Sequence, residues 1–295
     1  MPTPATPTTV TLARAPRLTP LLARGALLSP LKRPGATGGS GEAPAARLVL
    51  TDAAAAPERL ASYARICGFP ADGPLPVTYP HVIGFPLAMR LMADRAFPLP
   101  VLGLVHMTIA LTQHRALDRA ERPEITVYVD GLVPHRRGTE AIVVTEARVD
   151  GVLVWESHSR YLARHRTAAT GTDSPERAPE KAVGLPAVAE WELPADLGRR
   201  YGAASGDRNP IHLYPLTARL FGFPRAIAHG MWTVARCLAE YGAQGQVRAS
   251  AEFRAPVLLP GTVTYAAGDG AFALRTPATG GRPGRVHLTG EIASD

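Results

Sequence analysis

Hydrophobic and polar positions alternate along several stretches of the chain, and this period of two is typical of half-buried strands. Strands are therefore predicted at residues 47–51, 125–133, 139–149, 152–164, 247–253, 261–267, 272–276 and 285–293. Apolar residues at helical spacing instead predict helices over residues 57–66, 85–95, 101–118 and 229–241. The dipeptide Asp150-Gly151 predicts a tight type I′ turn between two of the strands. Hairpins of strands with separate helices indicate an α+β fold.

Composition divides the chain into parts. Residues 1–45 are rich in Pro, Thr, Gly and Ala, and they are predicted to form a flexible N-terminal arm. Residues 166–186 combine Thr, Ala and charged residues with three prolines, which predicts a linker. The linker separates a first unit over residues 46–165 from a second unit over residues 187–295, so two domains of ordinary size are expected.

The two units show the same predicted order of elements, which indicates an internal duplication. A single offset of 123 residues describes it, because this offset relates His106 to His229 and Gly138 to Gly261. Both histidines then open the apolar helix of their unit. Individual identities are few, and the prediction depends on the repeated order of helix and strands.

Charge and cysteine content narrow the classes of function. The formal net charge is +7, but the arginines are spread along the chain without the spacing of a DNA-binding motif, so no nucleic-acid partner is expected. An acidic small ligand and simple solvation explain the excess equally well. Cys67 and Cys237 lie far apart in apolar surroundings, which favours a reducing cytoplasm. Residues 1–30 lack the pattern of a secretory signal, and no apolar run suggests a membrane span.

Residues 205–212, Ser-Gly-Asp-Arg-Asn-Pro-Ile-His, place Asp207 and His212 five residues apart. A carboxylate and a neutral imidazole can hold a water between them, so that the imidazole takes a proton from the water while the acid moves one to or from a carbon. Either residue alone is explained as an ordinary turn or structural residue. Turn formation does not require both, nor the sequence Ile-Ala-His-Gly-Met at residues 227–231 that opens the later helix.

The start of that helix supplies a candidate for the remaining chemical requirement, which is a donor to a developing enolate oxygen. A backbone N–H at a helix N-terminus is such a donor, and the helix dipole strengthens it. Gly230 suits the position because a residue without Cβ lets a ligand approach the backbone closely.

These residues resemble the motif of the MaoC-type dehydratase family, which includes the (R)-specific enoyl-CoA hydratases. The matching positions are Tyr201, Ser205 to His212, Ala218, Gly222-Phe223 and Ile227 to Met231. The resemblance covers about forty residues, from Tyr201 to Glu240, without departure inside the motif. It implies a double hot-dog fold, in which two tandem units each wrap an antiparallel sheet around a long central helix.

The resemblance also implies an activity, namely reversible hydration of trans-2-enoyl thioesters or dehydration of (3R)-hydroxyacyl thioesters in fatty-acid metabolism. It implies Asp207 and His212 as the catalytic dyad and the Gly230 amide as the oxyanion donor. Residues expected to shape the site are Ser205, Asn209 and His229. The thioester makes the C2 proton acidic enough for a general base, so no cofactor is expected. No metal is expected either, because the histidines on the predicted strands and turns lack metal-ligand spacing. The acyl chain would arrive on coenzyme A or on an acyl-carrier protein.

The offset of 123 residues takes Asp207 to Gly84 and His212 to Met89. The first unit is therefore predicted to be degenerate, and its apolar residues either bind an acyl chain or form ordinary core. Side chains that could grip phosphates, or simply be solvated, are Lys32, Arg33, Arg136 and Arg137. A hot-dog thioesterase and a non-catalytic acyl-binding subunit remain alternatives. Acyl-chain length, the thiol carrier, and monomer against homodimer stay open.

Overall fold

The computed structural model describes residues 8–29, 32, 43–167, 184–280, 282 and 284–294. They form two compact units. The first is drawn from Met1–Ala54, Tyr79–Ile109 and Ala120–Ser174, and the second from Ala55–Thr78, Ala110–Arg119 and Pro175–Asp295. Most of the predicted linker, residues 168–183, lies outside the described residues.

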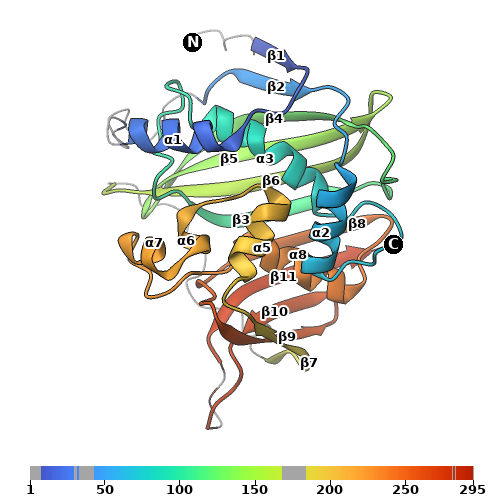
Figure 1. Ribbon diagram of the computed structural model, residues 1–295, viewed down its shortest axis with the longest axis vertical. Coiled ribbons are helices and arrows are strands. Elements are labelled where there is room, and N and C mark those ends of the chain that lie inside the picture. The colour runs from blue at the N-terminus through green and yellow to red at the C-terminus, as the bar shows by residue number, and fades with distance from the viewer. Residues whose placement is uncertain are drawn as a thin grey trace. The chain divides into compact units, whose positions relative to one another are not determined.

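The first unit is a sheet with one long helix packed on it (Figure 1). Its strands are β1 (Thr8–Leu12), β2 (Ala46–Leu50), β4 (Glu124–His135), β5 (Gly138–Val149), β6 (Val152–Arg164) and the part of β3 (Val105–Gln113) up to Ile109, in the spatial order β1-β2-β4-β5-β6-β3. β1 runs parallel to β2, and the β2–β4, β4–β5 and β5–β6 pairs are antiparallel. Helix α3 (Tyr79–Met92) lies close on β5, because a Cβ at Gly84 would come 2.6 Å from Thr145 Cγ2.

The second unit has the same plan with more helices. Its strands are β7 (Ala187–Leu193), β8 (Val247–Phe253), β9 (Gly261–Gly268), β10 (Ala271–Arg275) and β11 (Val286–Ser294), in the spatial order β8-β11-β10-β9-β7 with antiparallel neighbours. Its helices are α2 (Pro57–Cys67), α5 (Leu197–Ser205), α6 (Pro210–Leu213), α7 (Pro215–Leu220) and α8 (Gly230–Tyr241). The central helix α8 buries Trp232, Val234 and Leu238.

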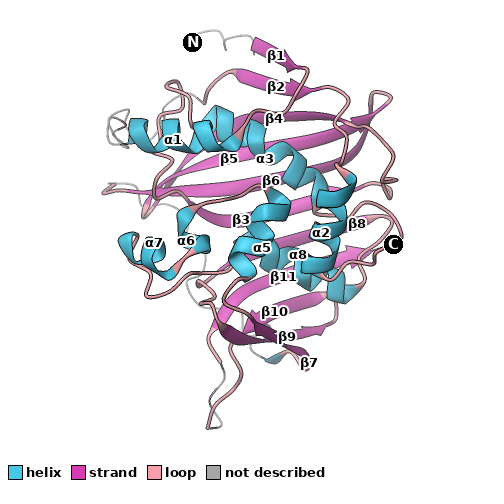
Figure 2. Cartoon of the chain, viewed as in Figure 1, coloured by secondary structure: helices cyan, strands magenta, loops and turns pink. Residues whose placement is uncertain are grey.

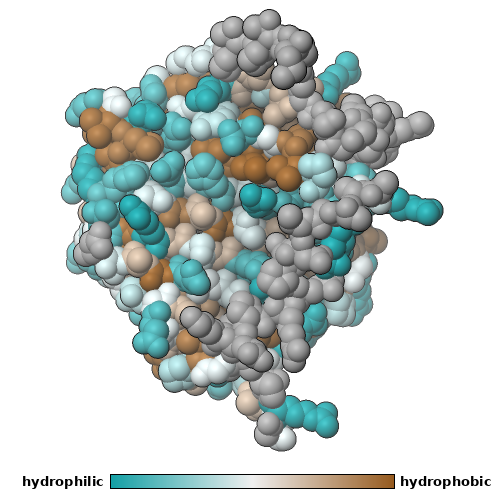
Figure 3. All heavy atoms as spheres, turned by 180° about the vertical axis from the view of Figure 1, so that it is seen from behind, coloured by the Kyte–Doolittle hydropathy of each residue, from teal (hydrophilic) through white to brown (hydrophobic). Residues whose placement is uncertain are grey.

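In each unit the helices lie on one face of the strands (Figure 2). Figure 3 shows the opposite face, where hydrophilic residues are interspersed among hydrophobic ones, as expected for strands whose side chains alternate between core and solvent. A long helix packed on an antiparallel sheet, repeated twice, is the double hot-dog arrangement, so the predicted α+β fold class is confirmed. Asp150 and Gly151 have φ of 50° and 78°, as a type I′ turn requires.

One predicted helix is wrong. Residues 101–118 contain strand β3, in which Met107, Ile109 and Leu111 are buried at every second position. This is the period of a strand, and the apolar character of the whole run hid it. The long helix of the first unit is instead α3, which begins six residues before the predicted helix at residue 85 and continues through Pro86.

The duplication is present in the order of elements, but the offset of 123 residues is wrong. Spatial order makes β3 the counterpart of β8 and β5 the counterpart of β10, so His106 on β3 does not correspond to His229, and Gly138 does not correspond to Gly261. The better match pairs α2 with α5. Tyr63 and Gly68 then correspond to Tyr201 and Gly206 at an offset of 138 residues.

The segment predicted as a flexible arm contains two elements that the sequence analysis missed. Strand β1 pairs with β2, and helix α1 (Leu18–Leu28) packs against α3. Across the described residues, no helix is both long and apolar enough to cross a membrane.

Candidate active site

The motif begins where α5 ends. Gly206 has φ +88° and closes the helix with a hydrogen bond from its N–H to Gly202 O (3.0 Å), a left-handed conformation that glycine adopts without strain. The Ser205 hydroxyl donates to Tyr201 O (2.9 Å) and accepts from Asp207 N (3.2 Å). The serine therefore fixes the backbone of Asp207 through short local bonds, in keeping with its predicted role of shaping the site.

Asn209 connects the acid to the following helix. Its N–H donates to Asp207 Oδ1 (3.1 Å), and its own Oδ1 accepts from Ile211 N (3.4 Å) as the N-cap of α6. Pro210 occupies the first position of α6, where its missing N–H costs nothing. The chain thus turns from Asp207 to His212 through a capped single turn of helix.

Two glycines on α5 allow this turn to lie against the helix. A Cβ at Gly198 would collide with the carbonyl oxygen of His212, and one at Gly202 would come 2.7 Å from Asp207 O. Side chains at these positions would push the turn away, so α5 is the platform on which the acid and the imidazole are placed.

His212 is buried and held in one tautomer. Its Nδ1 lies 2.8 Å from Ile227 O, and because a carbonyl only accepts, Nδ1 carries the hydrogen. The lone pair is then on Nε2. Burial lowers the pKa of His212 below its usual 6.5, although the Asp207 carboxylate and the Ile227 carbonyl oppose this shift. At neutral pH the ring is therefore a neutral base with Nε2 as the accepting atom.

His229 packs beside this base. Its ring stacks on His212 with centroids 3.7 Å apart, and its Nε2 donates to Asp207 O (2.9 Å). Burial, and then the neighbouring His212, hold the pKa of His229 well below its usual value, so it remains neutral. A neutral N–H bonded to the Asp207 backbone holds the turn in place, which supports the predicted shaping role.

The Asp207 side chain is 26% exposed, and its Oδ2 lies 3.9 Å from His229 Nε2. Burial raises the pKa of Asp207 above its usual value, against the lowering effects of His212 and of the Asn209 N–H. One side-chain atom from each of Asp207, His212 and His229 lies within 4.8 Å of the other two. The fold thus brings the predicted acid and base into one cluster.

Gly230 is the first residue of α8, after His229 at the N-cap. The first N–H groups of a helix have no partner within it, and the Gly230 amide lies at the positive end of the helix dipole, which favours a negatively charged oxygen. The structure also gives a packing reason for glycine here, because a Cβ would come 2.8 Å from Cε1 of the Phe253 ring.

The spacing of Asp207, His212 and His229 would also suit a three-ligand metal site. Two of the imidazole nitrogens, His212 Nδ1 and His229 Nε2, are already directed at carbonyl oxygens. The arrangement is more fully explained by hydrogen bonding, and the absence of a metal stays a prediction.

The sequence analysis missed the support that α2 gives to the motif. Tyr63 donates to or accepts from Thr78 Oγ1 (2.8 Å), and its ring lies 5.8 Å from that of Tyr201, which is itself 4.7 Å from His229. Trp232 Nε1 donates to Ile66 O (3.0 Å) at the end of α2. The equal spacing of Tyr and Gly in α2 and α5 was the available signal.

Comparison with known proteins finds a family model and curated relatives that match this chain. A family model described as MaoC like domain matches residues 173–269. The curated 3-hydroxyacyl-thioester dehydratase X of Mycobacterium tuberculosis is 36% identical over 242 residues, covering 80% of this chain and 85% of the relative.

The chain belongs to the MaoC-like dehydratase family. Another relative, enoyl-CoA hydratase ChsH3 of Mycobacterium tuberculosis, is 34% identical over 107 residues, or 33% of this chain and 35% of the relative.

Solved structures with a similar fold cover most of this chain. The crystal structure of HtdX from Mycobacterium tuberculosis has a TM-score of 0.70 and 33% identity, covering 84% of this chain and 99% of that one. A MaoC-like dehydratase from Phytophthora capsici has a TM-score of 0.66 at 19% identity, covering 87% and 95% of the two chains, and shares the fold.

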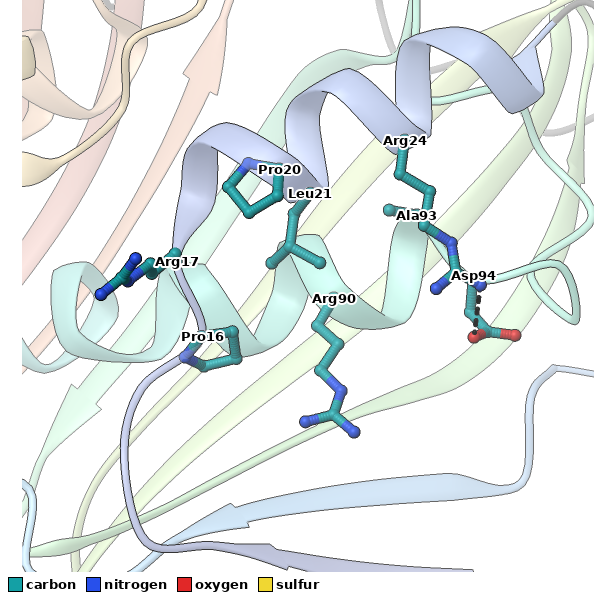
Figure 4. A pocket seen from close by; sticks show the side chains of 8 residues that line it. All are labelled: Pro16, Arg17, Pro20, Leu21, Arg24, Arg90, Ala93 and Asp94. Atoms are coloured by element: carbon teal, nitrogen blue, oxygen red, sulfur yellow. Dashed lines mark ion pairs between the residues drawn. The ribbon is translucent and has the colours of Figure 1, made fainter.

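A separate pocket of about 390 Å³ lies in the first unit of this MaoC-like chain, between α1 and α3 (Figure 4). Its charged lining residues are Arg17, Arg24, Arg90 and Asp94, and Arg24 pairs with Asp94 at 3.6 Å. None of these residues was singled out from the sequence.

Lys32, one of the predicted phosphate contacts, donates to the backbone oxygens of Met92 (3.1 Å), the last residue of α3, and of Asp94 (2.8 Å), and its contact with a phosphate stays a prediction. Arg136 and Arg137 form the turn between β4 and β5, and Arg33 lies outside the described residues.

Proposed function

We propose that this chain catalyses the reversible hydration of trans-2-enoyl thioesters, and equally the dehydration of (3R)-hydroxyacyl thioesters, in fatty-acid metabolism. The family and the names of its relatives support this reaction. The observation that carries it is the His212 tautomer, because the Ile227 carbonyl fixes the hydrogen on Nδ1 and leaves Nε2 as the basic atom of a ring that lies in one cluster with the Asp207 carboxyl.

In the hydration direction, His212 Nε2 takes a proton from a water whose oxygen bonds to C3 of the enoyl chain. The C2=C3 bond opens, and its electrons move toward the thioester carbonyl. Asp207 positions the water, and its carboxylate passes the proton that His212 has taken to C2, so that the hydroxyl and the hydrogen of one water are added and both residues return to their starting states. The (R) configuration at C3 is the one expected of this family.

The Gly230 N–H is proposed to receive the thioester oxygen as negative charge develops on it. A helix N-terminus is suited to this role because its dipole favours negative charge and needs no reorientation during the reaction. No step requires a cofactor, since the thioester itself delocalises the charge.

The test uses the near-ultraviolet absorbance of the conjugated enoyl thioester. Purified chain is mixed with trans-2-butenoyl-CoA and then with a longer enoyl-CoA, beside the Asp207→Asn and His212→Ala variants. Loss of the band without release of thiol, abolished in both variants, and an (R) product on chiral chromatography are expected. Release of thiol would favour a thioesterase, and a chain inactive on every thioester would favour an acyl-binding subunit.

Two further parts of the proposal concern the rest of the chain. At the positions of Ser205, Gly206 and Asp207, the matching helix α2 ends with Cys67 and is followed by Gly68 and Phe69. The first half therefore lacks the acid and is proposed to bind rather than react. Cys67 and Cys237 are buried free thiols whose pKa values burial raises, which supports a reducing, cytoplasmic setting.

A further inference from the structure

Helix α7 turns its large apolar side chains outward. Leu216 and Leu220 are 72% and 79% exposed, and their spacing of four residues places them on one helix face, whereas Ala218 is fully buried. Tyr214 and Phe221, at either end of the helix, are 53% and 43% exposed. Tyr214, Leu216, Leu220 and Phe221 together are called the α7 patch. Surface helices normally bury their larger apolar residues, so this inverted pattern indicates a surface that meets a partner.

The charged residues close to the α7 patch in sequence are nearly all arginines. Between residues 197 and 239 the chain has six arginines and no lysine, and Asp207 is the only acidic residue. Arginines at or beside helices α5 to α7 are Arg199, Arg200, Arg208, Arg219 and Arg225, all of them exposed except the partly exposed Arg199.

One of these cations, Arg199, lies against the α7 patch, and another, Arg219, is on helix α7 itself. The Arg199 guanidinium lies 5.2 Å from the centre of the Tyr214 ring and donates to Leu213 O (3.1 Å). Arg219 Nε donates to Pro224 O (3.3 Å). A partner that covers the apolar side chains would therefore meet positive charge at the rim.

The α7 patch is tied to the candidate active site. Thr217 Oγ1 donates to Pro210 O (2.6 Å), which joins α7 to the turn of α6 that carries His212. Tyr214 follows His212 by two residues. Figure 1 shows α7 at the outer edge of the second unit's ribbon, directly after α6.

We propose that the α7 patch docks an acidic protein that presents the acyl chain as a thioester. This inference rests on the proposed function, and it names the thiol carrier as a protein rather than a nucleotide. An apolar centre with a cationic rim complements a protein surface with an apolar centre and an acidic rim. A second copy of this chain would bring its own arginines against these. Leucines exposed by more than two thirds stand out from the surface and do not form the concave walls that a nucleotide requires.

The test compares one acyl group on three thiols: trans-2-octenoyl on an acidic acyl-carrier protein, on coenzyme A and on pantetheine. The variants are Leu216→Ser with Leu220→Ser, and Arg219→Glu with Arg225→Glu. Matched controls are Val188→Ser and Arg248→Glu, which change exposed residues on strands β7 and β8 of the same unit. Both patch variants should lower kcat/KM for the carrier-protein thioester by about tenfold or more and leave that for the pantetheine thioester unchanged. The controls should match the parent chain on all three thiols.

Salt provides a second readout, because kcat/KM for the carrier protein should fall with ionic strength while that for pantetheine does not. Equal losses on all three thiols would show that the patch merely supports the site, and a loss confined to coenzyme A would make the occupant a nucleotide. Either result overturns the proposal. It is also overturned if the patch variants keep the kcat/KM of the parent chain for the carrier protein, or if sedimentation shows a dimer of the parent chain that the patch variants do not form.

A chain that is inactive on every thiol would refute the proposed function without deciding the docking. Titration of the loaded carrier protein into the parent chain and the patch variants then decides it. Binding that the patch variants weaken supports the α7 patch as the docking surface, and equal or absent binding refutes it.

Discussion

Two substitutions separate the structural role of Asp207 from its role in the reaction. Its Oδ1 accepts the Asn209 N–H at 3.1 Å, and an asparagine at position 207 can keep that bond through its own carbonyl oxygen. Alanine cannot, and the partly buried Asn209 N–H would be left without its acceptor. The Asp207→Asn variant should therefore keep the turn, whereas Asp207→Ala should loosen it.

The sign of the pKa shift sets the expected stability. The folded-state pKa of Asp207 is raised, so the folded chain favours the neutral acid, and the ionised form present at neutral pH costs stability. Asp207→Asn removes this cost and should be at least as stable as the parent chain at pH 7. Asp207→Ala should lose about 1–3 kcal/mol of unfolding free energy, the usual cost of an unsatisfied buried donor.

The hydration activities of the two variants should not follow their stabilities. Both variants lack the ionisable group, so hydration of an enoyl thioester should fall by about 10²- to 10⁴-fold in each, the range of general acid–base catalysis. The measurements are urea unfolding and the decay of enoyl-thioester absorbance on the same preparations. Asp207→Asn activity within tenfold of the parent, or a loss of stability equal to that of alanine, would refute the division.

Three further predictions follow from the same site. Because the pKa of His212 is lowered from 6.5, the acidic limb of kcat/KM for hydration should lie below pH 6.5, and a limb above that value in a pH profile would contradict the neutral base. Gly198→Ala should cost about 1–3 kcal/mol in urea unfolding and lower hydration, while Gly131→Ala, which has open space around it, should change neither. Trp232→Phe should cost about 2–4 kcal/mol, since the Ile66 carbonyl loses its donor in a buried site, and an unchanged urea midpoint would argue against that bond.

The motif was predictable from sequence because its parts are local. Asp207 and His212 lie on one turn whose residue types set its geometry, so their proximity follows from five residues of sequence. Strand β6, at residues 152–164, and strand β8, at residues 247–253, were predicted with their observed bounds, since both show clear alternation.

Long-range contacts were not predictable in the same way. The apolar run at residues 101–118 fits a buried helix and a buried strand equally well, and only pairing with neighbouring strands makes β3. Helix α1 is stabilised by packing against α3, which no local pattern of residues 1–45 reveals. The proximity of α2 to α5 depends on tertiary packing for the same reason, although their shared Tyr and Gly spacing was visible.

The hydrogen bonds that place the acid and the base join residues between Tyr201 and His229. The segment from Tyr201 to His229 lies between β7 and α8, the first strand and the central helix of its unit. Its sequence can therefore change without disturbing the pairing of the strands. After a gene duplication, one copy can therefore drift at this segment while its sheet remains under selection for folding. Reactivity and architecture are inherited on separate stretches of sequence, and a two-unit chain with one reactive half is an accessible evolutionary outcome.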